Sequence, residues 1–290
     1  MVTTPTAPTA QELAKQALSQ LNALATLPEV TAKVIKTVED PRSSAAQLHA
    51  IVRHDPALVT RVLKVVNSAF YGLPGQVTSI DRAIVLLGLN AVKNLAVAAS
   101  MGQMFRGMKL SEKYTAKDLW THCVAVAVVA KELAKKVKPA LAEEAFLGGM
   151  IHDIGILIEL QTWPEQTRIL CERAGGTEPF MELEKSIVGV NHTYLGKMLA
   201  EKWQFPRACQ VVAGCHHMPH LAGEGERELT YIIYVADTLC CQAGHGFPLT
   251  ACHQTITPDH LRAIGADAAT VAAVRERIAE LVSNAAPLLN

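Results

Sequence analysis

The chain has 290 residues, of which 50% are hydrophobic, 19% are charged and 5% are aromatic. This is enough length and hydrophobicity for one or two folded domains, and it excludes a disordered chain. Lysine plus arginine and aspartate plus glutamate both number 27, so the formal net charge is zero. The charge therefore gives no reason to expect binding to nucleic acid or to an anionic membrane.

Seven cysteines occur without any CxxC pair, so neither a disulfide framework nor a zinc ribbon is indicated. The first residues, MVTTPTAPTAQELAKQ, lack the basic and apolar regions of a signal peptide. The most apolar long window, residues 83–101, contains two asparagines and a lysine and is too polar for a bilayer span. We expect a soluble protein in a reducing, cytoplasmic compartment, with no membrane contact.

Apolar spacing is helical almost throughout the chain, which predicts an all-α fold of two helical lobes. Residues 1–10 are rich in Thr, Pro and Ala and predict a loose tail. Helices are predicted over 11–26, 28–40 and 44–53, and from Pro56 onward, where Ser43-Ser44 and Asp55 supply caps. After a Gly/Pro loop, Thr78-Ser79-Ile80-Asp81 resembles a capping box for a helix that ends at Leu87. A further helix is predicted from about 90 to 105.

The polar stretch 106–117 predicts the boundary between the lobes, which places the first lobe at 11–108 and the second at 109–290. Residues 118–137 are apolar nearly all round, as in the central helix of a bundle. Asp118 is interpreted as a first-turn carboxylate favoured by the helix dipole. Further helices are predicted over 143–160, 183–203, 207–217 and 228–241, after a cap at Thr257-Pro258-Asp259, and over 271–282.

The order of histidines and aspartates in the second lobe is the main functional signal. Imidazole nitrogens and carboxylate oxygens suit borderline and hard divalent ions, so this set can hold one or two ions of Fe, Mn, Zn, Mg or Ni. We predict that six of the residues, all except His217, converge in one pocket. The candidate metal ligands are His122, His152, Asp153, His192, His216, His217 and Asp237.

These residues also have structural interpretations. His122 alone is more often a satisfied core histidine than a ligand, and His192 can simply cap its helix. His216 and His217 point about 100° apart on a regular helix, so both cannot face one ion equally. Asp237, inside a strongly apolar helix, is harder to explain because a buried carboxylate needs a partner.

The other residues with functional side chains carry weaker signals. Asn67 lies at a predicted helix end before the Gly/Pro loop, and its side-chain amide is expected to bond backbone there. The remaining histidines receive no role. No cysteine is placed beside a histidine in a way that suggests a nucleophile.

The chain resembles a known family in both lobes. The order His122, His152-Asp153, Asp237 is similar to the HD superfamily of metal-dependent phosphohydrolases. The insertion of His192 and His216-His217 is similar to its subgroup that hydrolyses cyclic dinucleotides. The strings LPEVTAKVIKTVEDP, IVRHDPALVTRVLKVVNSAFYG and SIDRAIVLLGLNAVKNL resemble the N-terminal signature of HDOD domains, the HD-related output domains of bacterial signalling proteins. With LWTHCVAVA, FLGGMIHDIG and AEKWQFP, the resemblance covers about residues 21–237.

This resemblance implies a regulatory module with an HDOD-type N-terminal lobe and an HD-like helical bundle. HDOD domains often lack part of the HD catalytic set, whereas this chain keeps it nearly whole. The cyclic-dinucleotide hydrolases carry a lysine three residues after the HD aspartate, where this chain has Ile156. Their Gly-Tyr-Pro loop is replaced by MPHLAGEGERELT. A metal site without that cation would bind phosphoryl substrates weakly.

Three hypotheses remain open from the sequence. In the first, the protein is a bacterial signal-transduction output that binds a signalling protein or a small-molecule or nucleotide signal. In the second, it is a metal-dependent phosphohydrolase acting on a nucleotide or phosphoester, and only then is Asp153 catalytic. In the third, a purely structural metal ties the second lobe together with four of the ligands. We favour the first, because fold resemblance does not by itself carry activity.

Overall fold

The computed structural model describes residues 8–20, 29–38, 40 and 42–289, and these residues form helices joined by turns and loops. Within these ranges the only β-type pairing is an isolated bridge between Lys109 and Thr115. The predicted all-α fold is confirmed. Among the same residues, no helix combines the length and the hydropathy that a bilayer crossing requires.

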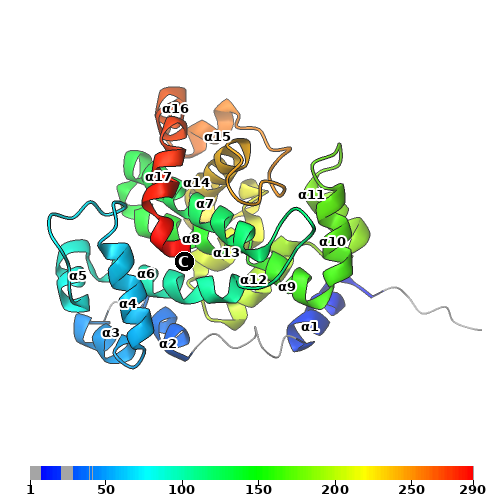
Figure 1. The fold of residues 1–290 in the computed structure, drawn as a ribbon. Helices are drawn as coiled ribbons and strands as arrows, with labels where there is room; N and C mark the ends of the chain where they lie inside the picture. The colour runs from blue at the N-terminus through cyan, green and yellow to red at the C-terminus, as the bar shows by residue number, and fades with distance from the viewer. Residues whose placement is uncertain (1–7, 21–28, 39, 41, 290) are drawn as a thin grey trace, which may run out of the picture.

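The N-terminal part of the chain is a group of short helices followed by one buried helix (Figure 1). The predicted tail and the ends of the first two predicted helices lie largely outside the described residues, although α1 already begins at Ala10. The elements are α1 (Ala10–Gln20), α2 (Glu29–Val38), α3 (Ala45–Val52), α4 (Pro56–Val66), α5 (Ile80–Leu87), α6 (Leu89–Met101) and the 3-10 helix η1 (Gly102–Phe105).

The C-terminal part is a bundle around the long helix α7 (Figure 1). Its elements are α7 (Ala116–Val137), η2 (Pro139–Leu141), α8 (Ala142–Ile151), α9 (Gly155–Thr162), α10 (Pro164–Arg173), α11 (Phe180–Ile187), α12 (His192–Lys202), α13 (Arg207–Cys215), η3 (Pro219–Leu221), α14 (Glu224–Gln242), α15 (Pro258–Ala263), α16 (Ala268–Glu276), α17 (Ile278–Asn284) and η4 (Ala286–Leu289).

Three of the four caps that the sequence predicts begin helices, at Ser44, Asp55 and Thr257. Ser44 begins α3 with a full capping box, and Asp55 accepts a hydrogen bond from the Leu58 amide ahead of Pro56 in α4. The capping box predicted from Thr78 to Asp81 is wrong, because Ser79 is the N-cap and accepts from the Arg82 amide. Thr and Ser are both favoured N-cap residues, so the sequence alone does not show which of the adjacent Thr78 and Ser79 begins the helix.

Asp118 has the first-turn position that the sequence predicts, and its role is more specific than a dipole effect. Its carboxylate accepts hydrogen bonds from the backbone amide and the hydroxyl of Thr115, at 2.7 and 2.6 Å. The Asp118 amide donates to the Thr115 hydroxyl in return. This capping box fixes the start of α7, the helix that carries His122.

Several long predicted helices are wrong in extent. The predicted helix 143–160 breaks between α8 and α9, 183–203 breaks between α11 and α12, and 271–282 breaks between α16 and α17. Helix α10 was not predicted, and α14 is longer than the predicted 228–241. Apolar spacing continues through each break, so the periodicity alone did not reveal these corners.

The two parts share one continuous hydrophobic core. Helix α6 is buried along residues 91–101 and packs against α2, α4 and α5 on one side and α8 on the other. The C-terminal η4 returns to pack against α4 and α7. The predicted boundary 106–117 covers the segment between η1 and α7 and the first two residues of α7.

Candidate metal centre

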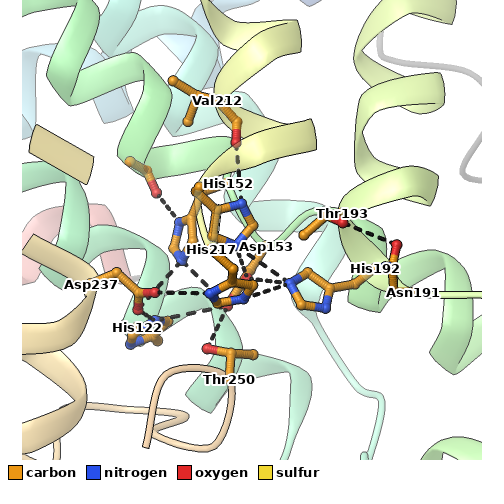
Figure 2. Close-up of polar contacts among 12 residues, drawn as sticks. His122, His152, Asp153, Asn191, His192, Thr193, Val212, His217, Asp237 and Thr250 are labelled. Atoms are coloured by element: carbon orange, nitrogen blue, oxygen red, sulfur yellow. Dashed lines mark hydrogen bonds and ion pairs between the residues drawn. The ribbon is translucent and has the colours of Figure 1, made fainter. Parts of the chain in front are cut away.

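Five separate parts of the bundle bring the predicted residues together (Figure 2). His122 lies in the second turn of α7, His152 and Asp153 lie in the turn between α8 and α9, and Asp237 lies in α14. The other three come from the first residue of α12 and the turn after α13, namely His192, His216 and His217. Figure 2 shows Asp153 at the centre of the group, with Asp237 and His122 on one side and His192 on the other.

Two glycines allow the backbones to approach closely enough for this convergence. A Cβ on Gly149 of α8 would lie 2.6 Å from the Ala127 Cα in α7. A Cβ on Gly155 at the start of α9 would lie 1.9 Å from the His192 carbonyl oxygen. Real Cβ atoms do not approach so closely, so these contacts require glycine. The first brings α8 against α7, and the second brings the Asp153 turn against α12.

One half of the site is formed by His122, His152, Asp153 and Asp237. The His122 Nε2 lies 3.0 Å from Asp237 Oδ1 and 3.8 Å from Asp153 Oδ2. The His152 Nε2 lies 3.3 Å from Asp153 Oδ2 and 3.9 Å from Asp237 Oδ1. Two imidazole nitrogens thus face two carboxylates at distances that a single cation between them would span.

The other half is formed by Asp153, His192, His216 and His217. The second oxygen of Asp153, Oδ1, lies 3.3 Å from His192 Nε2 and 3.3 Å from His216 Nε2. The His217 Nε2 lies 3.0 Å from His192 Nε2. Asp153 therefore presents one oxygen to each half, which is the arrangement of a carboxylate that bridges two ions.

His216 and His217 both reach this half because α13 ends before them. The predicted helix 207–217 is wrong in its last two residues, since α13 ends at Cys215 and a turn follows. The angle of about 100° expected on a regular helix does not apply in this turn. Their Nε2 atoms lie 3.4 and 3.0 Å from the same His192 Nε2.

The Nδ1 atom of each of the five imidazoles contacts a partner that is not one of the seven candidate ligands, which leaves Nε2 to face inward. An oxygen acceptor at Nδ1 fixes the tautomer and the ring orientation of a metal-binding histidine. Four of the five imidazoles have such an acceptor, whereas the Nδ1 of His217 faces the amide nitrogen of Gln254. The Nδ1 partners are the His245 carbonyl for His122 (3.3 Å), the Gly149 carbonyl for His152 (2.8 Å), the Glu184 carboxyl for His192 (2.5 Å), the Val212 carbonyl for His216 (3.1 Å) and the Gln254 amide for His217.

Three buried atoms in the centre have no hydrogen-bond partner: His152 Nε2, Asp153 Oδ1 and Asp237 Oδ2. Six of the seven side chains are 0% exposed, and His217 is 4% exposed. A buried donor or acceptor without a partner is costly, and a cation would satisfy all three atoms. The residues therefore fit one or two divalent ions. A mixed set of nitrogen and oxygen donors suits Zn, Fe, Mn or Ni better than it suits an ion that prefers oxygen ligands alone.

The protonation states favour ligation on the side of His192, His216 and His217. Burial lowers the pKa of all three imidazoles, so they are neutral near pH 7, as metal ligands must be. Burial alone would raise the pKa of Asp153, but the positive charge of His152, whose Nε2 lies 3.3 Å from Asp153 Oδ2, holds it well below its usual range. Burial likewise opposes protonation of His152, and Asp153 outweighs it and raises that pKa to about 9.

Some residues of the site were not predicted from the sequence. Glu184, in α11, is wholly buried and also accepts the His192 amide at 3.2 Å. Gln254 contacts His217, and the Thr250 hydroxyl donates to Asp153 Oδ2 at 3.3 Å. The one sequence signal for Glu184 was its place on the apolar side of an amphipathic helix, and its spacing from His192 matches no known motif. The Cys241 thiol contacts Asp237 Oδ1 at 3.5 Å, and burial raises its pKa well above the usual range.

Ile156, which stands where the cyclic-dinucleotide hydrolases have lysine, is 0% exposed and belongs to the hydrophobic core. Its side chain therefore has a packing role in α9. The described part of the segment that replaces the Gly-Tyr-Pro loop forms η3 and the start of α14.

The comparisons with known proteins agree with this architecture. A protein from Geobacter sulfurreducens described as an HDOD domain protein superposes with a TM-score of 0.81 and 20% identity, covering 95% of this chain and 97% of that one. A Shewanella amazonensis SB2B protein provisionally named a phosphohydrolase gives a TM-score of 0.74 and 23% identity, covering 96% and 97%. At these identities the likeness concerns the fold.

A relative from Treponema pallidum (strain Nichols), described as an uncharacterized protein, is 25% identical over 231 residues, which are 79% of this chain and 44% of that protein. The chain thus spans less than half the length of this relative. The model of the HDOD domain matches residues 24–219, which is more than half of the chain. The chain belongs to the HDOD family.

Proposed function

We propose that this protein is a bacterial signal-transduction output of the HDOD type, a regulatory binding module whose second lobe holds one or two divalent ions. The observation that carries the proposal is the enclosure of the centre: donors for two ions converge, and six of the seven side chains have no exposed surface. An ion in this position is accessible to the protein's own side chains and not to a large substrate.

Two further features support a binding role over catalysis. A phosphohydrolase must stabilise charge on the phosphoryl oxygens, and cationic side chains commonly do so. The position of the lysine in the hydrolases is Ile156, inside the core. The net charge of zero adds no bulk attraction for nucleic acid or an anionic membrane. We expect the input to be a signalling protein or a small-molecule or nucleotide signal, and the compartment to be the reducing cytoplasm.

The alternative is a metal-dependent phosphohydrolase acting on a nucleotide or phosphoester. It is favoured by Asp153, whose two oxygens face the two halves of the site at 3.3 Å. Divalent ions bound there would lower the pKa of a water molecule and polarise a phosphoryl oxygen. The chain's own contribution would be to orient the ligands through the Nδ1 contacts and, through Asp153, to hold the two halves together.

The test begins with metal analysis by mass spectrometry on protein purified without chelator or affinity metal. We expect one or two divalent ions per chain, and loss of at least one in Asp153→Asn. The matched control is Asp81→Asn, since Asp81 is an exposed aspartate whose side chain is 61% exposed, and it should leave the metal content unchanged. A metal content of zero in protein grown with Fe, Mn, Zn and Ni would contradict the proposal.

The two functions separate in an activity panel on the metal-loaded protein. With a chromogenic phosphodiester, nucleotides and cyclic dinucleotides as substrates, the regulatory function predicts turnover no greater than that of Asp153→Asn. Robust wild-type turnover that Asp153→Asn abolishes and Asp81→Asn retains would establish the phosphohydrolase instead.

A further inference from the structure

A second site lies at the junction of the two lobes, away from the metal centre. It is a cavity of about 390 Å³ between the end of α6 with η1, helix α4, the first turns of α7 and the C-terminal η4. None of the seven candidate metal ligands lines it. This volume lies in the range of about 300–1,000 Å³ of small-molecule sites, so the cavity can admit a metabolite.

One wall of the cavity is cationic. Arg61, Arg106 and Lys117 line it, and its described lining residues include no carboxylate. The side chains of Arg106 and Lys117 are exposed, and neither makes an ion pair or a hydrogen bond with the side chain of another described residue. Arg61 donates its Nε to the Ala99 carbonyl at 3.1 Å, and its Nη2 lies 3.9 Å from Asp55, an incomplete ion pair.

The position of Lys117 adds to this positive potential. It lies in the first turn of α7, where the helix dipole is positive and a lysine is unfavourable by itself. Although the Asp118 carboxylate caps the start of α7, three cations around one cavity in a chain of zero net charge form a local site for an anion.

The other lining side chains are largely apolar and come from η1, α7 and η4. Phe105 and Trp120 pack with ring centroids 4.8 Å apart, and Pro287 and Leu289 of η4 extend this apolar wall. The Trp120 Nε1 donates to the Leu288 carbonyl at 2.8 Å, which holds η4 in place. A ligand in the cavity would thus contact both cations and apolar surface.

We propose that this cavity binds a small phosphorylated ligand with an apolar or planar moiety, of the nucleoside monophosphate class. The phosphate lies among Arg61, Arg106 and Lys117, because charge-assisted hydrogen bonds to phosphate are the strongest contacts available there. The nucleoside lies against the wall formed by Pro287 and Leu289. Binding in this cavity does not require the metal. Only the interpretation of the ligand as the signal of the output module rests on the proposed function.

The site is well placed for an input to the output module. It is lined by α4 and η1 from the first lobe and by α7 and η4 from the second. Trp120 on its apolar wall precedes His122 of the metal centre by two residues on the same helix. A ligand in this cavity therefore contacts both lobes and the helix that carries a candidate metal ligand.

The experiment is isothermal titration of the full 290-residue chain with AMP, ribose 5-phosphate and adenosine. We expect saturable binding of AMP below about 1 mM, and weaker binding of both fragments, which lack either the base or the phosphate. The double variant Arg106→Gln/Lys117→Gln should weaken AMP binding about tenfold or more. The charge-matched control Lys64→Gln/Lys109→Gln changes two exposed lysines outside the cavity and should bind AMP as the wild type does.

A parallel titration after chelation separates this site from the metal centre. AMP affinity that is unchanged by chelation supports the cavity, and loss of binding on chelation would move the ligand to the metal centre and overturn the inference. Absence of saturable AMP binding, equal affinity for AMP and either fragment, or equal weakening in both double variants would also overturn it. None of these results alters the metal content, so failure here is distinguishable from failure of the proposed metal site.

Discussion

Gly155→Ala is the sharpest test of how the backbone positions the metal centre. The added Cβ would lie 1.9 Å from the His192 carbonyl oxygen and 2.8 Å from the Gly196 amide nitrogen. Both are backbone atoms, so no side chain can rotate out of the way. Helices α9 and α12 would have to separate by about an ångström or more to restore a normal contact.

Overpacking of a core typically costs about 1–3 kcal/mol, and a clash with backbone lies at the upper end. We expect Gly155→Ala to lower the free energy of unfolding by about 3 kcal/mol, measured by urea titration of the chelated protein. In the metal-loaded protein we also expect weaker binding of one ion, because the separation would lengthen the 3.3 Å approach of Asp153 Oδ1 to His192 Nε2.

The matched control is Gly225→Ala, at an exposed helical glycine of α14 whose added Cβ would meet nothing within 4 Å. Alanine there should be neutral or should stabilise the protein by about 0.5 kcal/mol, since it reduces the entropy of the unfolded chain. If Gly155→Ala were as stable as Gly225→Ala and bound the same number of ions, the close approach of α9 and α12 would be refuted.

Three further predictions follow from buried or paired groups. Ile156→Lys places an unpaired charge in the core and should destabilise the protein by about several kcal/mol, as expected for a buried ion. Ile169→Lys, at a side chain that is 39% exposed, is the control and should leave the melting temperature unchanged in the same thermal melts. Asn67→Ala removes hydrogen bonds to the Leu63 carbonyl and to both the carbonyl and the amide of Val77, at 2.9, 2.8 and 2.7 Å, and should cost about 2 kcal/mol in urea titration; no loss relative to Gln76→Ala in the same loop would contradict this. Chelation should lower the melting temperature, because an ion at 100 times its Kd stabilises the fold by about 2.7 kcal/mol, and an unchanged melt in metal-replete protein would exclude tight binding.

The helical class and the candidate ligands could be predicted from the sequence, because both follow from local patterns that do not depend on tertiary contacts. Helical spacing predicts α-helix at almost any position of this chain, and an aspartate such as Asp237 inside an apolar helix must have a partner. Asn67 was expected to bond backbone at its own helix end, and it does so at Leu63. The sequence did not reveal that it also joins Val77 across the loop, since that contact depends on the path of the chain.

The helix breaks were harder to predict, for two different reasons. The break after α11 has a local signal that the periodicity obscured: Gly189 has φ +89° and the Gly189 amide donates to the Glu184 carbonyl, a glycine-terminated helix end. The break between α8 and α9 has no such signal, because it is set by the contact of Gly155 with His192. Glu184 was missed for the same reason: its role depends on a fold that places α11 beside the start of α12.

The hypothesis of a purely structural metal can be weighed against the geometry. A structural ion in a protein usually has four ligands, and His122, His152, Asp153 and Asp237 already provide that number in one half. His192, His216 and His217 would then be superfluous, yet each has its Nδ1 held by a partner and its Nε2 directed inward. Orienting three buried imidazoles and leaving Asp153 Oδ1 without a hydrogen bond would be costly in a site for one ion. Under the proposed function, the second half would therefore hold a second ion.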